Sequence, residues 1–117
     1  MNNTGSIGEK LAKYYLSQKG YHILEQNYRA IFGEIDIIAE KNNCICFVEV
    51  KCRTSDKYGF PEESITAHKK NKIIKVAQLY IKQNRIEDKL FRFDIIALNF
   101  NNFSLTRIKH ITNAFYQ

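Results

Sequence analysis

The sequence has little of what marks secreted or membrane-bound proteins. Its few cysteines are Cys44, Cys46 and Cys52, and no two of them form a CxxC pair. An odd number without that spacing argues against a disulfide framework or a zinc site, so we expect buried, reduced thiols. The first ten residues, MNNTGSIGEK, contain no apolar stretch, and no run approaches the roughly 18 apolar residues of a membrane-spanning helix. We therefore expect a cytoplasmic protein without a membrane partner.

The composition instead indicates a folded, basic domain. The 117 residues are 44% hydrophobic, with seven tyrosines and eight phenylalanines, and they contain neither an internal repeat nor a low-complexity segment. This suffices for a single core, and we expect one domain over residues 1–117. The net charge of +6 favours polyanionic partners. His22, His68 and His110 have no acidic or cysteine partner at ligand spacing, so we expect them at the surface.

Hydrophobic periodicity predicts an alternation of helices and strands. Apolar residues at helical spacing indicate one helix over residues 7–19, which Gly20 ends, and another over residues 66–84. Strands are expected at residues 21–28, 34–41, 44–51, 91–100 and 104–111. The order is α-β-β-β-α-β-β, so the second helix is a crossover that makes the third and fourth strands parallel. We expect an α/β fold with a mixed sheet.

The second and third strands place two carboxylates opposite each other. Asn42 and Asn43 suit a two-residue turn because asparagine tolerates positive φ. Lys41 then pairs with Cys44, and counting outward places Asp36 opposite Glu49, with β-carbons about 4.5–5.5 Å apart. The alternate positions form an apolar face suited to a core, with the pairs Ile35–Val50, Ile37–Val48 and Ala39–Cys46.

Two ionised carboxylates at that separation need a neutralising partner. They repel by about 3 kcal/mol at an effective dielectric constant of about 20, whereas a favourable cross-strand pair contributes only about 0.2–1 kcal/mol. Three partners are open: a bound cation, the ammonium group of Lys51 on the same face, or one shared proton. Carboxylate oxygens suit a hard divalent ion, and a lysine beside them suits phosphate chemistry. The alternative is an ordinary solvated face on which Lys51 bridges Glu34 and Glu49.

Other parts of the sequence bear on this pair. The second helix contains no acid and five lysines, which are Lys69, Lys70, Lys72, Lys75 and Lys82. Because that helix starts near the end of the strand that carries Glu49, it delivers Lys69 toward the carboxylates. Glu9 lies at the border of the first helix's apolar stripe and can reach the sheet, or it serves only as a dipole partner in the first helical turn. The polar connection over residues 52–64 is long enough to indicate a functional loop.

Together these features resemble the PD-(D/E)XK nuclease superfamily: an acid on the first helix, an aspartate on the second strand, Glu-x-Lys on the third, then a crossover helix. More closely, the chain is similar to the small bacterial YraN family of predicted endonucleases, which is related in fold to archaeal Holliday junction resolvases. The likeness runs through IGEKLAKYYL, NYRAIFGEIDIIA, FVEVKCR, KNKIIKVAQLYI and RFDIIAL, nearly the whole chain. It implies a restriction-endonuclease-like sheet. The superfamily's name includes a proline before the aspartate, and Ile35 stands at that position here. That proline is not a metal ligand.

The resemblance also implies roles for individual residues. Asp36, Glu49 and the carbonyl group of Val50 would bind Mg²⁺ or Mn²⁺. Lys51 would orient the attacking water or stabilise charge on the phosphate, and Glu9 would be an accessory carboxylate. The expected activity is metal-dependent hydrolysis of phosphodiester bonds.

The expected partner is nucleic acid, most of all DNA, and branched or otherwise structured DNA is among the candidate targets. The basic helix and the loop would hold the phosphate backbone through Arg53, Lys57, Lys69, Lys72 and Lys75. Two alternatives stay open. One is a non-catalytic nucleic-acid-binding module with the same fold, and the other is an adaptor whose basic helix docks an acidic protein. The sequence leaves the oligomeric state open, a homodimer included.

Overall fold

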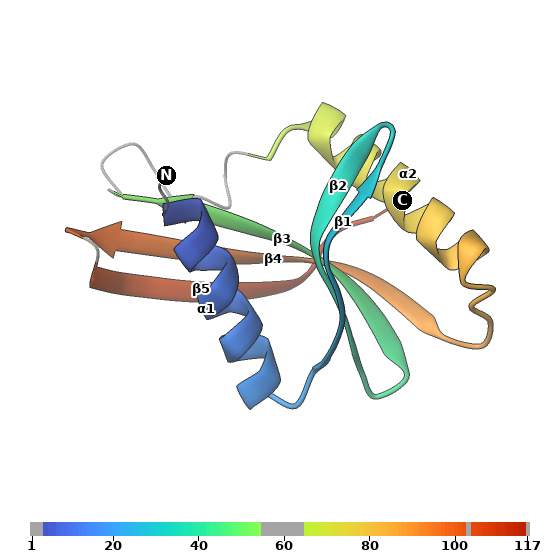
Figure 1. The fold of residues 1–117 in the computed structure, drawn as a ribbon, viewed down its shortest axis with the longest axis horizontal. Coiled ribbons are helices and arrows are strands. Elements are labelled where there is room, and N and C mark those ends of the chain that lie inside the picture. The colour runs from blue at the N-terminus through green and yellow to red at the C-terminus, as the bar shows by residue number, and fades with distance from the viewer. Residues whose placement is uncertain (1–3, 55–64, 103, 117) are drawn as a thin grey trace.

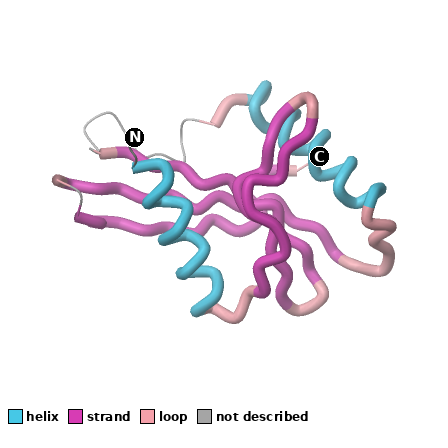
Figure 2. Tube along the Cα trace, viewed as in Figure 1, coloured by secondary structure: helices cyan, strands magenta, loops and turns pink. Residues whose placement is uncertain are grey.

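The computed structural model describes residues 4–54, 65–102 and 104–116. The elements are α1 (Thr4–Gln18), β1 (His22–Ala30), β2 (Gly33–Lys41), β3 (Cys44–Arg53), α2 (Ala67–Gln83), β4 (Leu90–Asn101) and β5 (Ser104–Phe115). Within these residues the strands form one five-stranded sheet in the order β1-β2-β3-β4-β5. Only the β3–β4 pair is parallel, as the crossover predicts. The α/β class and the element order are confirmed (Figures 1 and 2).

The two helices cover opposite faces of the sheet, and each closes its own apolar cluster. On one face, Ala12 and Leu16 of α1 pack with Ile37, Val48 and Ile96. The other cluster joins α2 to the opposite face through Ile73, Val76, Tyr80, Phe47 and Phe93. The sheet is therefore the middle of three layers, as the ribbon shows (Figure 1). None of the helices in the described part of the chain is long and apolar enough to cross a membrane.

The helix ends use the signals that the sequence provides. α1 stops before Gly20, whose φ of +92° is a left-handed conformation that glycine adopts without steric cost. α2 begins after Thr66, whose side-chain oxygen accepts a hydrogen bond at 3.1 Å from the backbone N–H of Lys69. This cap fixes the first turn of α2, and with it the starting point of the Lys69 side chain.

The first turn of α1 departs from the predicted apolar stripe. Ile7 is 46% exposed, although its spacing predicts burial. The buried residue is Gly8, where an added β-carbon would lie 2.1 Å from Sγ of Cys52 on β3. The helix therefore makes its closest approach to the sheet through a residue without a side chain. The next residue, Glu9, is half-buried.

All three cysteines lie within the described residues and carry free thiols. All three have even residue numbers, so on a strand with alternating side chains they share one face. They contact the cluster on the α1 side. Cys46 is buried, whereas Cys44 and Cys52 are half-buried. The expectation of buried thiols is thus confirmed for Cys46 and holds only in part for the other two.

The β2–β3 hairpin has the predicted register near its turn. Lys41 pairs with Cys44 and the ladder continues to Ile37 and Val48. Asn42 and Asn43 have φ of +52° and +61°, the conformation expected of this turn. Beyond Ile37 the ladder ends, and β2 curves with β1 away from β3 toward α2 (Figure 1). Ile35 consequently packs in the α2-side cluster and not beside Val50, so that predicted pair is wrong.

Candidate active site

The predicted carboxylates converge where β2 leaves β3. Oδ2 of Asp36 accepts a hydrogen bond at 2.8 Å from the backbone N–H of Val50, which lies beyond the end of the ladder. Glu49, the neighbour of Val50, is only 4% exposed, and its carboxyl group is within hydrogen-bonding reach of Asp36. The divergence of the strands thus places two acidic side chains where backbone pairing would otherwise continue.

The environment of Asp36 holds a proton on the pair. Burial, followed by the charge of Glu49, raises the pKa of Asp36 to about 8, and the charge of Glu9 adds to the increase. The hydrogen bond from Val50 opposes this shift without cancelling it. At neutral pH the Asp36 carboxyl group is therefore mostly protonated, and it hydrogen-bonds Glu49. Of the three neutralising partners that the sequence leaves open, the raised pKa of Asp36 favours the shared proton when no metal ion is bound.

A lysine of α2 supplies the second neutralising contact. Nζ of Lys69 lies 3.2 Å from Oε2 of Glu49, so the helix delivers Lys69 to the pair as predicted. The Lys69 side chain is 47% exposed and that of Glu49 is 5% exposed. The ammonium group therefore reaches from the surface down to a buried carboxylate.

The alternative role for Lys51, a bridge between Glu34 and Glu49, is not observed. Glu34 pairs instead with Arg29 on the adjacent strand, at 3.1 Å, and Glu49 pairs with Lys69. Lys51 is half-buried two residues after Glu49, on the same face of β3. It lies beside the carboxylate pair, and neither of these two ion pairs involves it.

Glu9 reaches the same region from α1. Its charge contributes to the raised pKa of Asp36. Burial, and next the charge of Glu9, raise the pKa of the Cys52 thiol to about 11. The charge of Glu9 thus acts on residues of β2 and of β3, and its role as an accessory carboxylate stays a prediction. Four elements thus bring together Glu9, Asp36, Glu49 and Lys69.

The donor chemistry of the pair fits a hard divalent cation. Among residues 4–54, 65–102 and 104–116, no group of three or more His, Cys, Asp or Glu side chains forms a ready metal site. Mg²⁺ often takes only one or two carboxylates and completes its shell with water and phosphate oxygens, so Asp36 and Glu49 are sufficient donors. The Val50 carbonyl group stays a predicted ligand, because the observed contact of Val50 is through its N–H.

The remaining cations predicted to bind nucleic acid are distributed as follows. Lys72 and Lys75 are exposed on α2, and Arg53 is half-buried at the end of β3. Lys57 lies outside the described residues. Lys69 is the member of the set that contacts the carboxylate pair directly.

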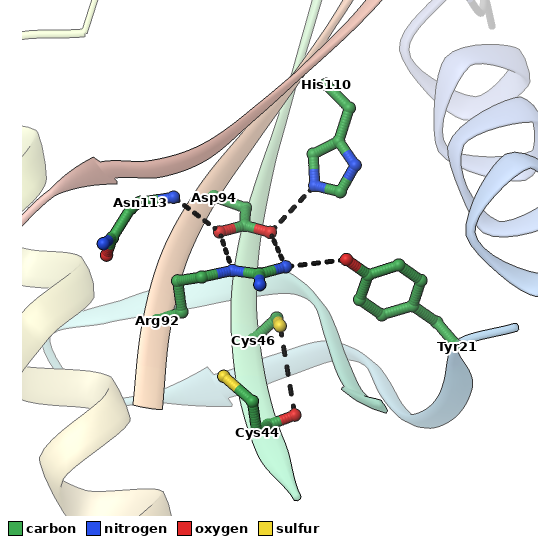
Figure 3. A network of polar contacts seen from close by, with 7 residues as sticks. All are labelled: Tyr21, Cys44, Cys46, Arg92, Asp94, His110 and Asn113. Atoms are coloured by element: carbon green, nitrogen blue, oxygen red, sulfur yellow. Dashed lines mark hydrogen bonds and ion pairs between the residues drawn. The ribbon is translucent and has the colours of Figure 1, made fainter. Parts of the chain in front are cut away.

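A second polar cluster, around Asp94, escaped the sequence analysis (Figure 3). Asp94 is fully buried and accepts hydrogen bonds from Nε and Nη2 of Arg92, at 2.8 and 2.9 Å, and from the N–H of Asn113 at 3.0 Å. Nε2 of His110 lies 2.8 Å from Oδ2 of Asp94, the oxygen that also accepts from Nη2 of Arg92. Nη2 of Arg92 also donates to the Tyr21 hydroxyl at 2.7 Å. The His110 side chain is only 8% exposed, so its predicted surface position is wrong.

This second cluster is a satisfied buried network. Desolvation alone would raise the pKa of Asp94, but the hydrogen bonds from His110 and Arg92 hold it below its ordinary value. Asp94 therefore stays ionised with four contacts on its two oxygens, whereas the Asp36 carboxyl group is kept protonated. The contrast makes the Asp36–Glu49 pair, whose pKa is strongly raised, the better candidate for a functional site.

Comparison with known proteins gives one consistent family. The model described as "Uncharacterised protein family UPF0102" matches residues 8–98, which include Glu9, both carboxylates and Lys69. A UPF0102 protein of Caldanaerobacter subterraneus subsp. tengcongensis is 50% identical over 113 residues, 95% of this chain and 93% of its own. One of Persephonella marina is 52% identical over 111 residues (95% and 91%), and one of Clostridium botulinum strain Loch Maree is 50% identical over 113 (95% and 92%).

Proposed function

The chain belongs to the UPF0102 family, and we propose that it is a metal-dependent endonuclease that hydrolyses phosphodiester bonds, with DNA as its main substrate. The observation that carries the proposal is the pair Asp36–Glu49, two close carboxylates whose burial and mutual repulsion raise the pKa of Asp36 to about 8. The family match agrees with the resemblance to the YraN family. The assignment to the wider nuclease superfamily is part of the proposal.

In this proposal Asp36, Glu49 and the Val50 carbonyl group hold Mg²⁺ or Mn²⁺. The ion, when bound, supplies an acidified water and polarises a phosphoryl oxygen. Because that site must first lose the proton held by Asp36, its affinity for the ion falls as the pH drops below about 8. The chain's own residues must therefore release a proton before they can bind a metal ion.

In the proposed reaction, the side chains around the pair stabilise charge on the substrate and within the site. Lys51, on the same face as Glu49, stabilises negative charge on the attacked phosphate. Lys69 neutralises Glu49 until a cation does so, and its half-exposed side chain is then free to contact a phosphate. Glu9, whose charge acts on Asp36, serves as an accessory carboxylate.

The basic surface of α2 holds the nucleic acid. Lys72 and Lys75 are exposed on that helix, and Arg53 ends the strand that carries Glu49. Contacts of this kind position a phosphate backbone without reading its sequence, so discrimination among substrates must come from shape.

The test is a cleavage assay with branched, flapped and single-stranded DNA, in Mn²⁺ and in chelator. We expect Mn²⁺-dependent cleavage that Asp36→Asn and Glu49→Gln abolish without loss of the fold. Binding that weakens with salt but gives no cleavage of any of these DNAs would replace the nuclease by a non-catalytic binding module, which the concentration of lysines on α2 also suits. Binding to an acidic protein without binding to DNA would indicate the adaptor.

A further inference from the structure

The turn between β1 and β2 presents two large apolar side chains to solvent. Ile31 is 101% exposed and Phe32 is 37% exposed, and they are the two residues between the strands. Single exposed apolar residues are common on protein surfaces. These two are adjacent, and they end the β1–β2 hairpin, which projects beside α2 (Figure 1). Together they form a small apolar surface at the end of that hairpin.

Two basic residues, Lys72 and Arg29, lie near this tip. An added β-carbon at Gly33 would lie 3.7 Å from Cβ of Lys72, so the tip is beside the basic helix. Arg29, which pairs with Glu34, precedes the turn and has a side chain that is 77% exposed. An apolar tip in a basic setting suits a partner that combines negative charge with flat apolar faces. Nucleic acid has both, in its phosphates and in its bases.

Two elements, β2 and α2, connect the tip to the candidate active site. Gly33 and Asp36 are three residues apart on β2, about 10 Å along an extended strand. On α2, Lys72 follows the Glu49 partner Lys69 by about 4.5 Å of helix rise. A strand of nucleic acid held at the carboxylates would therefore meet the tip about three base steps away, at about 3.4 Å per step.

Building on the proposed function, we infer that Ile31 and Phe32 form an apolar wedge that contacts unstacked bases. The substrate class is then a nucleic acid whose stacking is interrupted about three steps from the scissile phosphate. A continuous duplex presents phosphates and polar base edges, so an apolar tip gains nothing from it. Base faces become accessible only at a flap, bulge, nick or branch, where apolar side chains can insert between steps and an aromatic ring can stack.

The experiment compares two DNAs that differ only in stacking. One is a continuous labelled duplex, and the other is the same duplex with a short unpaired flap and a 2-aminopurine at the interruption, both in chelator to prevent cleavage. The variant is the double substitution Ile31→Ser and Phe32→Ser. The matched control is Leu105→Ser, because Leu105 is 42% exposed on β5, outside the tip.

The parent protein is expected to bind the flapped DNA more tightly and to change the 2-aminopurine fluorescence. The double variant should lose about tenfold in affinity for flapped DNA, keep its affinity for the duplex within about twofold, and lose the fluorescence change. The control should match the parent. An equal loss on both DNAs, or no loss on flapped DNA, overturns the wedge while the proposed nuclease stands. Failure of the parent to bind either DNA overturns both.

Sedimentation of the same proteins addresses self-association. If the wedge is correct, the parent and the double variant have the same oligomeric state. A parent dimer that the double substitution converts to a monomer would show that a second copy of the chain covers Ile31 and Phe32, and the inference would then be wrong.

Discussion

Substitution of Asp36 by asparagine separates a metal-binding carboxylate from a structural one. The change removes the charge and the proton but keeps the shape, and the amide oxygen can still accept the hydrogen bond from the Val50 N–H. Two unit charges about 5 Å apart repel by about 3 kcal/mol at an effective dielectric constant of about 20. The metal-free variant should therefore be at least as stable as the parent, and more stable wherever the parent's pair is fully ionised.

The pH dependence of this difference has a definite sign. The pKa of Asp36 rises from 3.8 to about 8 on folding, so between these values the folded state binds more protons than the unfolded state. The parent's free energy of unfolding must then fall as the pH rises through that window. Asp36→Asn removes this contribution. The two proteins should differ little near pH 4. Near pH 8 the variant should be more stable by roughly 3–6 kcal/mol, between the repulsion alone and the full shift of about four pKa units at about 1.4 kcal/mol each.

Divalent ions should narrow this difference in stability. An ion that binds only the folded parent stabilises it by about 2.7 kcal/mol at a hundred times its Kd, and the variant should gain much less. Thermal melts of both proteins near pH 5 and pH 8, with and without Mn²⁺, measure all of these differences. Asp88→Asn is the matched control, because it makes the same chemical change at an exposed site. A destabilised variant beside a metal-insensitive parent would refute the reasoning.

Further predictions concern the basic helix, the α1–β3 contact and the second polar cluster. Replacing Lys72 and Lys75 by alanine should flatten the salt dependence of DNA binding by roughly two units, and an unchanged slope would remove the helix from the interface. Gly8→Ala should cost about 1–3 kcal/mol in urea unfolding because its methyl group meets Sγ of Cys52, and Cys52→Ala should restore part of the loss; simple additivity would contradict the contact. Asp94→Ala should cost about 3 kcal/mol by leaving a guanidinium group without its partner, and a neutral result would show that the network contributes nothing.

The local order around the site was predictable because short-range rules determine it. The turn at Asn42–Asn43 and the alternating pattern fix the register near the turn, and the crossover fixes the direction of β4. The position of Lys69 follows from these two results, since α2 must start near the end of β3. Each of these steps depends on chain geometry and not on which side chains happen to meet.

The positions of Ile35 and His110 differ from the prediction because they depend on irregularities in strand pairing, which sequence periodicity does not reveal. On the N-terminal side of Ile37, β2 is no longer paired with β3, and Ile35 lies in the α2-side cluster. In the β4–β5 pairing, the register shifts between Asn99 and Phe100 of β4, and Ile96 then pairs with His110. A regular hairpin around Asn101–Asn102 would place His110 on the other face. That single irregularity moves the histidine to Asp94, and no composition or spacing signal announces it.

The central claim is tested most directly by single-turnover cleavage of flapped DNA in Mn²⁺, with the parent and Asp36→Asn compared side by side at saturating protein. The account predicts that the parent cuts the DNA, that chelator stops it, and that the variant binds the same DNA without cutting it. Cleavage by Asp36→Asn at the parent's rate, or cleavage by the parent that persists in chelator, would contradict the assignment of phosphodiester hydrolysis to the Asp36–Glu49 pair.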